Sequence, residues 1–141
     1  MKQELVSDWM TRDVITITPK TSLKEAHDIM NSKSIRRLPV VSDGKVVGIV
    51  TLGDIRGAEP SQATSLSVWE VNHLLAELKV DEIMSRKVAS IQQTEIIGDA
   101  AKIMLEKKFS GLPVVDEEDH LVGIITESDI FRLVVNEWHN D

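Results

Sequence analysis

The chain repeats itself, and this self-similarity constrains its fold more than any other feature. Three matching pairs lie 74 residues apart and three later pairs lie 75 apart: Met10–Met84, Met30–Met104 and Pro39–Pro113, then Gly48–Gly123, Thr51–Thr126 and Asp54–Asp129. One residue is therefore inserted between the two groups, in the segment DEEDH that lies opposite SDG. A turn between two strands tolerates such a change of length best, so the sequence places a surface turn there.

The first repeat has the pattern strand, helix, strand, strand, helix. The β-branched run Val14–Ile17 predicts a strand, and the apolar spacing over 23–30, behind a Ser-x-x-Glu capping box, predicts a helix packed on one face. Two short strands, Leu38–Val41 and Lys45–Val50, follow on either side of a Gly-containing hairpin turn. A last helix is expected to begin near Thr51.

The second repeat copies this pattern with one departure at its first helix. Ile97 and Met104 continue the apolar stripe, but Ile96 and Asp99 replace the Ser and Glu of the capping box. The helix start is therefore predicted to rely on Thr94 or Glu95.

A unit of about 50 to 60 residues buries only a modest part of its surface when it stands alone. We therefore expect an α/β (α+β) fold in which two β-α-β-β-α repeats pack sheet to sheet about a pseudo-twofold axis. The expected boundaries are residues 1–58 for the first repeat, 59–79 for a connector, and 80–141 for the second repeat.

The connector is predicted to carry an amphipathic helix. Ser67 and Glu70 form a capping box, and an apolar stripe follows it, made of Val68, Val71, Leu75 and Leu78. Trp69 is expected to be buried beside this stripe, because a single Trp next to an apolar face is more often core than a docking anchor.

Composition excludes several classes of protein. The chain has no Cys, so disulfides and thiolate chemistry are absent, and its net charge of −7 opposes extended binding to nucleic acid or anionic membranes. No apolar run approaches the roughly 20 residues that span a bilayer, and the first residues lack the order of a signal peptide. A cytoplasmic protein is expected.

The motif that carries most chemical information occurs twice, over residues 48–54 and 123–129. Each copy places a Thr hydroxyl and an Asp carboxylate one helical turn apart, and an ionised carboxylate can accept both hydroxyl protons of a ribose diol. Thr-x-x-Asp is also an ordinary capping box, which is the better interpretation of either copy alone. Because both copies follow Leu-Pro-Val-Val, we predict Asp54 and Asp129 as ribose ligands.

These motifs resemble the cystathionine-β-synthase (CBS) domain family over nearly the whole chain, from Val6 to Val135. The resemblance implies a non-catalytic regulatory module with two clefts between its repeats. Such a module binds an adenosine-containing nucleotide (AMP, ADP, ATP, S-adenosylmethionine or NAD), requires no further cofactor, and often forms a homodimer. The connector over 61–78 is similar to that of tandem CBS proteins related to the acetoin-utilisation accessory protein.

The resemblance also assigns residues to the two clefts. The favoured cleft would contain Asp129, Thr126, Arg36, Arg37 and Thr16. The second cleft would contain Asp54, Thr51, Ser90, Ser110 and Gly111. Hydrogen bonds to charged groups contribute roughly 1.5 to 3 kcal/mol each, so the lack of arginines in the second cleft should weaken phosphate binding there at least about tenfold.

Other functions have less support in the sequence. There is no phosphate-binding Gly-rich loop, no nucleophile motif and no His spacing typical of a metal site, so no catalytic or metal-binding residue is expected. The alternative is a dimerisation and docking scaffold that ignores nucleotides and uses Trp9, Trp69 or Trp138 to bind a partner.

Overall fold

The computed structural model describes residues 4–60 and 65–139, which divide into two compact units. Unit 1 contains Met1–Val14 and Ala89–Asp141, and unit 2 contains Ile15–Val88. Residues 61–64 of the predicted connector, and the ends of the chain at 1–3 and 140–141, lie outside the described residues. Each unit therefore combines the opening segment of one repeat with the remaining elements of the other repeat.

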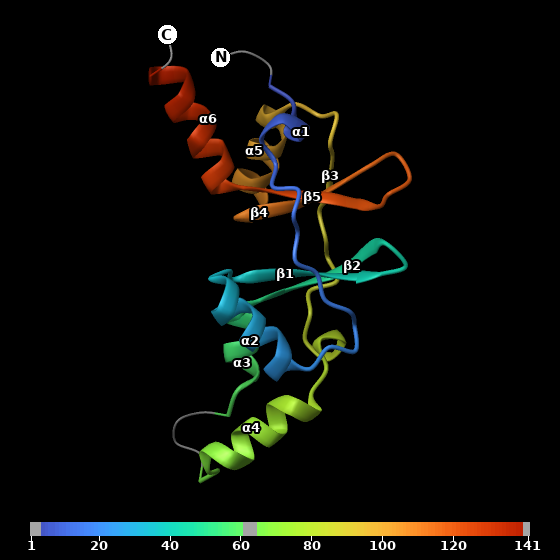
Figure 1. The fold of residues 1–141 in the computed structure, drawn as a ribbon, viewed down its shortest axis with the longest axis vertical. Helices are drawn as coiled ribbons and strands as arrows, with labels where there is room; N and C mark the ends of the chain where they lie inside the picture. The colour runs from blue at the N-terminus through green and yellow to red at the C-terminus, as the bar shows by residue number, and fades with distance from the viewer. Residues whose placement is uncertain (1–3, 61–64, 140–141) are drawn as a thin grey trace. The chain divides into compact units, whose positions relative to one another are not determined.

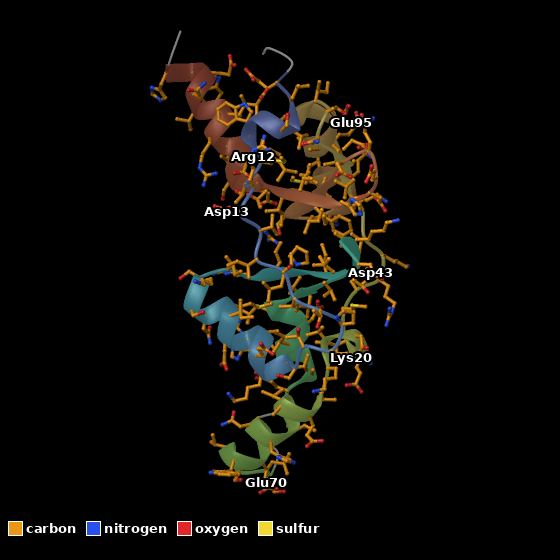
Figure 2. All side chains as sticks on the ribbon, turned by 45° about the vertical axis from the view of Figure 1, so that its right-hand side comes forward. Arg12, Asp13, Lys20, Asp43, Glu70 and Glu95 are labelled. Atoms are coloured by element: carbon orange, nitrogen blue, oxygen red, sulfur yellow. The ribbon has the colours of Figure 1, made fainter. Side chains whose placement is uncertain are left out.

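Unit 2 has the helix, two strands and helix that were predicted to follow the first strand of the first repeat. Its elements are α2 (Leu23–Lys33), β1 (Arg37–Ser42), β2 (Lys45–Thr51), α3 (Leu52–Ala58), α4 (Val68–Glu77) and the short 3-10 turn η1 (Val80–Glu82). Strands β1 and β2 pair antiparallel, and α2 and α3 pack against them (Figure 1). The predicted hairpin is confirmed, because Asp43 and Gly44 both have positive φ, 53° and 78°; Asp43 is labelled at the turn in Figure 2.

The predicted strand Val14–Ile17 forms only at its last residue. Ile17 makes a single parallel bridge to Val40, with its N–H donating to the Pro39 carbonyl at 3.1 Å. The boundary between the units falls at Val14 and Ile15, so β-branched residues at this point lie in the segment that crosses from one unit to the other. β-branched residues favour an extended backbone, but a strand forms only where a neighbouring strand pairs with it along its length.

Unit 1 repeats the arrangement with one strand more. Its elements are α1 (Val6–Trp9), β3 (Ile91–Gln92), α5 (Ile97–Lys107), β4 (Gly111–Val115), β5 (Leu121–Thr126) and α6 (Glu127–His139). Strand β3 pairs parallel with β4, and β4 pairs antiparallel with β5. The three helices of this unit lie on one side of its sheet (Figure 1). The α/β class predicted from the sequence is confirmed.

The opening segment of each repeat contributes a core residue to the unit that the other repeat builds, and it pairs with a strand of that unit. In unit 1, Val6 is fully buried and Thr11 exchanges backbone hydrogen bonds of 2.8 and 2.9 Å with Ile124. In unit 2, Val80 is fully buried and Ser85 bonds in the same way to Ile49. The two repeats therefore complete each other's cores, and this exchange could not be read from the repeat pattern.

The start of α5 differs from the prediction. Its N-cap is Ile96, which makes no side-chain capping bond, so the expectation that Thr94 or Glu95 caps the helix is wrong. The N–H of Ile97 donates instead to the carbonyl of Glu4 at 2.8 Å. Because a backbone group from the opening segment satisfies this end of the helix, a capping side chain is not needed.

The prediction that Trp69 is buried is also wrong. Trp69 is 84% exposed and Val68 is 79% exposed, whereas Leu75 is buried in the core of unit 2. The capping box of Ser67 and Glu70 is present as predicted. The helix contacts the core only from Val71 onward, so its first turn contributes the cap but no packing.

Candidate functional site

The two Thr-x-x-Asp motifs occupy equivalent positions, where the last strand of each repeat passes into the helix that follows it. Thr51 is the final residue of β2 and the N-cap of α3, and Thr126 is the final residue of β5 before α6. This position holds the two side chains close together. It therefore fixes the carboxylate beside the end of the sheet.

In the first repeat, Thr51 and Asp54 form a complete capping box. The N–H of Thr51 donates to Asp54 Oδ2 at 2.9 Å, and the N–H of Asp54 donates to Thr51 Oγ1 at 3.1 Å. Asp54 is half-buried. The structure therefore confirms the interpretation of this motif as a capping box. The capping bond leaves other acceptor positions of the carboxylate open.

In the second repeat, the carboxylate of Asp129 is more enclosed and has more partners. Asp129 is 3% exposed, and its Oδ2 accepts from the Thr126 N–H at 2.9 Å and the Thr126 hydroxyl at 3.1 Å. Its Oδ1 accepts from the guanidinium of Arg132, which also makes an ion pair with it. Asp129 is the one buried charged residue in the described part of the chain, and these bonds compensate for its burial.

Each motif lies beside the residues that precede Leu-Pro in its own repeat. Arg37 pairs with Thr51 across β1 and β2, and the N–H of Leu52 donates to the Arg36 carbonyl at 2.8 Å. The side chain of Arg36 is exposed, and Arg37 is half-buried. A basic pair and a carboxylate therefore occur together within unit 2.

The same pairing brings uncharged groups together in unit 1. Gly111 pairs with Thr126 across β4 and β5, and the N–H of Glu127 donates to the Ser110 carbonyl at 3.1 Å. Gly111 is buried and Ser110 is half-buried. This half of the site offers a carboxylate and backbone groups, with no cation from the residues before Leu-Pro.

Thr16 and Ser90 lie at equivalent places just before the residues that pair in parallel with the sheet. Both are exposed, in unit 2 and unit 1 respectively. Each of the two predicted clefts combines residues of both units: the favoured one takes Asp129 and Thr126 from unit 1 and the other three residues from unit 2. The structure brings Thr126 and Asp129 together, and likewise Thr51 and Asp54. The remaining members of each cleft, and the combinations across units, stay predictions.

The glycines of the motif have a structural reason of their own. A Cβ added to Gly123 would lie 2.6 Å from Met10 Sδ and 2.8 Å from the Thr11 carbonyl oxygen. A Cβ added to Gly48 would clash in the same way with Met84 and with the Ser85 carbonyl. Glycine is needed here because the opening segment of the other repeat lies against the backbone of the strand.

One residue of the site was missed at the sequence level. Arg132 lies three residues after Asp129 on α6, a spacing at which helical side chains meet. With the offset of 75, its match in the first repeat is Gly57, so Arg132 was not visible in any comparison of shared motifs. A search for differences between the repeats would have found it.

The inserted turn between β4 and β5 has its own electrostatics. Asp116 Oδ1 accepts from the N–H groups of His120 at 3.0 Å and Glu118 at 2.9 Å. The His120 bond, aided by the Glu118 bond and the charge of His120, holds the pKa of Asp116 below its ordinary value. This arrangement stabilises the turn between β4 and β5.

The described residues contain neither a metal-binding cluster nor a helix that could cross a membrane. Over 4–60 and 65–139, no group of three or more His, Asp or Glu side chains is placed to hold a metal ion. Among the helices that the structure describes, none has both the length and the apolar character needed to cross a membrane.

The fold and the geometry define the class of this protein: a paired module in which each repeat holds a hydroxyl and a carboxylate side by side. The profile of the CBS domain family matches residues 6–61 and 80–136, so the chain belongs to the CBS domain family. It spans about half the length of two relatives from Methanocaldococcus jannaschii, 47% of MJ1225 at 36% identity and 43% of MJ0188 at 33% identity.

Solved structures of CBS pairs match the chain over most of its length. The CBS domain pair of protein MJ0100, in complex with 5′-methylthioadenosine and S-adenosyl-L-methionine, has a TM-score of 0.78 and 32% identity, covering 96% of this chain and 99% of that one. CBSX2 in complex with AMP has a TM-score of 0.79 and 27% identity, with coverage of 96% and 99%. The acetoin utilisation protein AcuB from Vibrio cholerae has a TM-score of 0.79 and 31% identity, with coverage of 97% and 94%. The predicted likeness to acetoin-utilisation proteins is confirmed.

Proposed function

We propose that this chain is a non-catalytic regulatory module that binds an adenosine-containing nucleotide, with Asp54 and Asp129 accepting the ribose hydroxyls. The observation that carries the proposal is the duplicated Thr-x-x-Asp motif, which holds a carboxylate at the junction of strand and helix in both repeats. The CBS pair of MJ0100 with S-adenosyl-L-methionine and CBSX2 with AMP support the choice of ligand class.

The capping role of each aspartate is compatible with ribose binding. Capping in the first repeat uses Oδ2 of Asp54, and an ionised carboxylate has about four acceptor positions. The same geometry that starts the helix therefore orients the carboxylate for a diol. Ligand binding would add hydrogen bonds to a side chain that is already ordered, which reduces the entropy lost on binding.

The favoured cleft combines Asp129 and Thr126 with Arg36, Arg37 and Thr16. Exposed Arg36 is available to a phosphate, and guanidinium groups bind phosphate oxygens with planar, charge-assisted hydrogen bonds. The second cleft, with Asp54, Thr51, Ser90, Ser110 and Gly111, lacks such a pair. It should therefore bind the phosphate of a nucleotide more weakly than the favoured cleft does.

Calorimetric titration tests the proposal directly. Purified protein, freed of bound ligand, is titrated with AMP, ADP, ATP, S-adenosylmethionine and NAD, and we expect saturable binding of at least one. Mass spectrometry of the small molecules released from native protein would identify the ligand carried from the cell. A protein that gives no heat with any of the five, and releases no nucleotide, would contradict the proposal.

Comparison of two variants tests the ranking of the clefts. Asp129→Ala should weaken AMP binding more than Asp54→Ala, because the cleft of Asp129 is the one that takes the arginine pair. The loss of one charge-assisted hydrogen bond predicts a weakening of roughly tenfold or more. The opposite order of the two variants would show that the ranking is wrong.

The second candidate is a homodimeric docking scaffold, favoured by the exposure of Trp69 at 84% and Trp138 at 75%. Exposed aromatic side chains are typical of binding surfaces. This scaffold would form a stable dimer whose sedimentation ignores nucleotides. The nucleotide module, proposed here as a cytoplasmic homodimer, would instead change its sedimentation or its thermal stability when AMP or ATP is added.

A further inference from the structure

Arg132 occupies the part of the Asp129 carboxylate that capping leaves open. The Thr126 N–H and hydroxyl both donate to Oδ2, while the Arg132 guanidinium donates to Oδ1. Three of about four acceptor positions are therefore filled within the protein. A ribose diol needs two positions, so it can bind fully only where a protein donor leaves.

Of these donors, the arginine is the one that can move. The Thr126 groups are fixed at the junction of β5 and α6, but the Arg132 side chain is 65% exposed while Asp129 is 3% exposed. The guanidinium covers a buried carboxylate from the solvent side. A ligand that arrives from solvent therefore meets Arg132 before it meets Asp129.

The structure also provides a place for the displaced side chain. Arg132 lines an open groove of about 630 Å³ on α1 and α6, together with the aromatic residues Trp9 and Phe131. An arginine released from a carboxylate gains by lying on an aromatic face, so its displacement costs less than the ion pair alone would suggest.

The first repeat lacks this competitor. The residue that matches Arg132 is Gly57 on α3, which has no side chain, and Asp54 is half-buried instead of enclosed. The two carboxylates share one motif and differ in this contact. The presence or absence of this arginine contact is therefore encoded at one position of the repeat, Gly57 in the first copy and Arg132 in the second.

We propose that Arg132 is a specificity-determining residue that competes with the ribose hydroxyls for the Asp129 carboxylate. It lowers the affinity of the Asp129 site for adenosine compounds and so sets the ratio of the two affinities. This inference rests on the proposed nucleotide-binding function. It predicts that loss of an arginine from an acidic site strengthens the binding of a ligand.

Removal of the competitor is the first test. In protein that carries Asp54→Asn, so that the Asp129 site is measured alone, Arg132→Ala should tighten the binding of adenosine by roughly three- to tenfold. Adenosine is the first probe because it has the diol without a phosphate, and AMP is the second. Arg132→Gln, which keeps most of the side-chain length without the charge, should act in the same direction if Arg132→Ala is unstable.

Lys102→Ala is the matched control. Lys102 lies on α5 in the same unit and pairs with Glu106 at 4.0 Å, so the variant removes one cation and one ion pair without touching the site. Its adenosine affinity should equal that of the parent. Arg132→Ala combined with Asp129→Asn should likewise leave adenosine binding at the Asp54 site unchanged.

Transplantation of the arginine is the second test. In protein that carries Asp129→Asn, Gly57→Arg should weaken adenosine binding at the Asp54 site by a similar factor. A Cβ at Gly57 meets no atom within 4 Å, and arginine favours a helix more than glycine does, so the substitution fits α3. If Gly57→Arg keeps the thermal stability of its parent, weaker adenosine binding reflects competition by the new arginine and not loss of folded protein.

The outcomes separate the inference from the function on which it rests. Tighter binding with Arg132→Ala and weaker binding with Gly57→Arg would support the inference. Unchanged or weaker adenosine binding with Arg132→Ala and Arg132→Gln, in protein that binds adenosine, would overturn it and leave the proposed function intact. If neither the parent nor any variant binds adenosine, AMP, ADP, ATP, S-adenosylmethionine or NAD, the proposed function fails and the inference fails with it.

Discussion

Single residues in this protein have more than one role, and the aspartates show it most clearly. Asp54 accepts a hydrogen bond from the backbone N–H at the start of α3, and Asp129 does so at the start of α6 while it is paired with Arg132. Asp116 organises the inserted turn by accepting from two backbone N–H groups. In each case a side-chain oxygen of the aspartate accepts from backbone N–H groups, so one residue fixes the conformation of the chain around it.

The pH dependence of the inserted turn is the prediction at this scale. The pKa of Asp116 is lower in the folded chain than in the unfolded chain, so its contribution to stability is fully present above the unfolded pKa and is lost as the pH falls through the folded pKa. Side-chain carboxyl NMR titration should give Asp116 a midpoint below that of a free Asp. A midpoint at or above the ordinary value would show that the His120 and Glu118 bonds do not persist in solution.

At the scale of elements, the strand of the Gly-Ile-x-Thr motif owes its glycine to close packing. Gly123 on β5 lies under Met10 and Thr11, and Gly48 on β2 lies under Met84 and Ser85. This contact joins the opening segment of one repeat to the strand of the other repeat that leads into the proposed site. The same strand thus holds the core together and positions the threonine and the aspartate.

Substitution of these glycines tests this packing. Gly123→Ala should destabilise the protein by about 1 to 3 kcal/mol, because its Cβ would lie 2.8 Å from a backbone oxygen that cannot rotate away. Urea unfolding of the variant measures the change in free energy. Gly98→Ala is the control: its Cβ would meet no atom within 4 Å on α5, so stability should stay equal or rise slightly. Equal stability of both variants would contradict the close approach.

At the scale of the whole molecule, the two repeats are linked by exchange of their opening segments. Residues before Val14 complete the core of unit 1, and the residues from Val80 to Val88 complete unit 2. Val6 is fully buried in a core that, apart from Val6, Met10 and the partly buried Trp9, is built from the second repeat. Neither repeat, taken as a stretch of sequence, contains a complete core.

Val6→Ala should therefore destabilise elements that are far from it in sequence. The loss of two buried methyl groups should cost about 2 kcal/mol. Amide hydrogen exchange should show faster exchange in α5 and β4 of unit 1, with a smaller effect in β1 and β2 of unit 2. Faster exchange confined to β1 and β2 would show that the opening segment belongs to its own repeat in solution.

The sequence by itself determined the duplication, the place of the insertion, the helix, two strands and helix that follow the first predicted strand of each repeat, and the Thr-x-x-Asp pair in both copies. These features are local, since hydrophobic periodicity, turn residues and capping residues act over a few positions. The family followed from the same short motifs.

Only the tertiary structure decided which segment completes which core, and three features depend on it. Glu4 replaces a side-chain cap at α5, Met10 explains Gly123, and Val14–Thr16 fails to form a strand where the chain crosses between units. Arg132 belongs to the same class, because its importance lies in the buried carboxylate that it covers. Contacts between distant segments leave no period in a sequence, so they become visible only when the chain is folded.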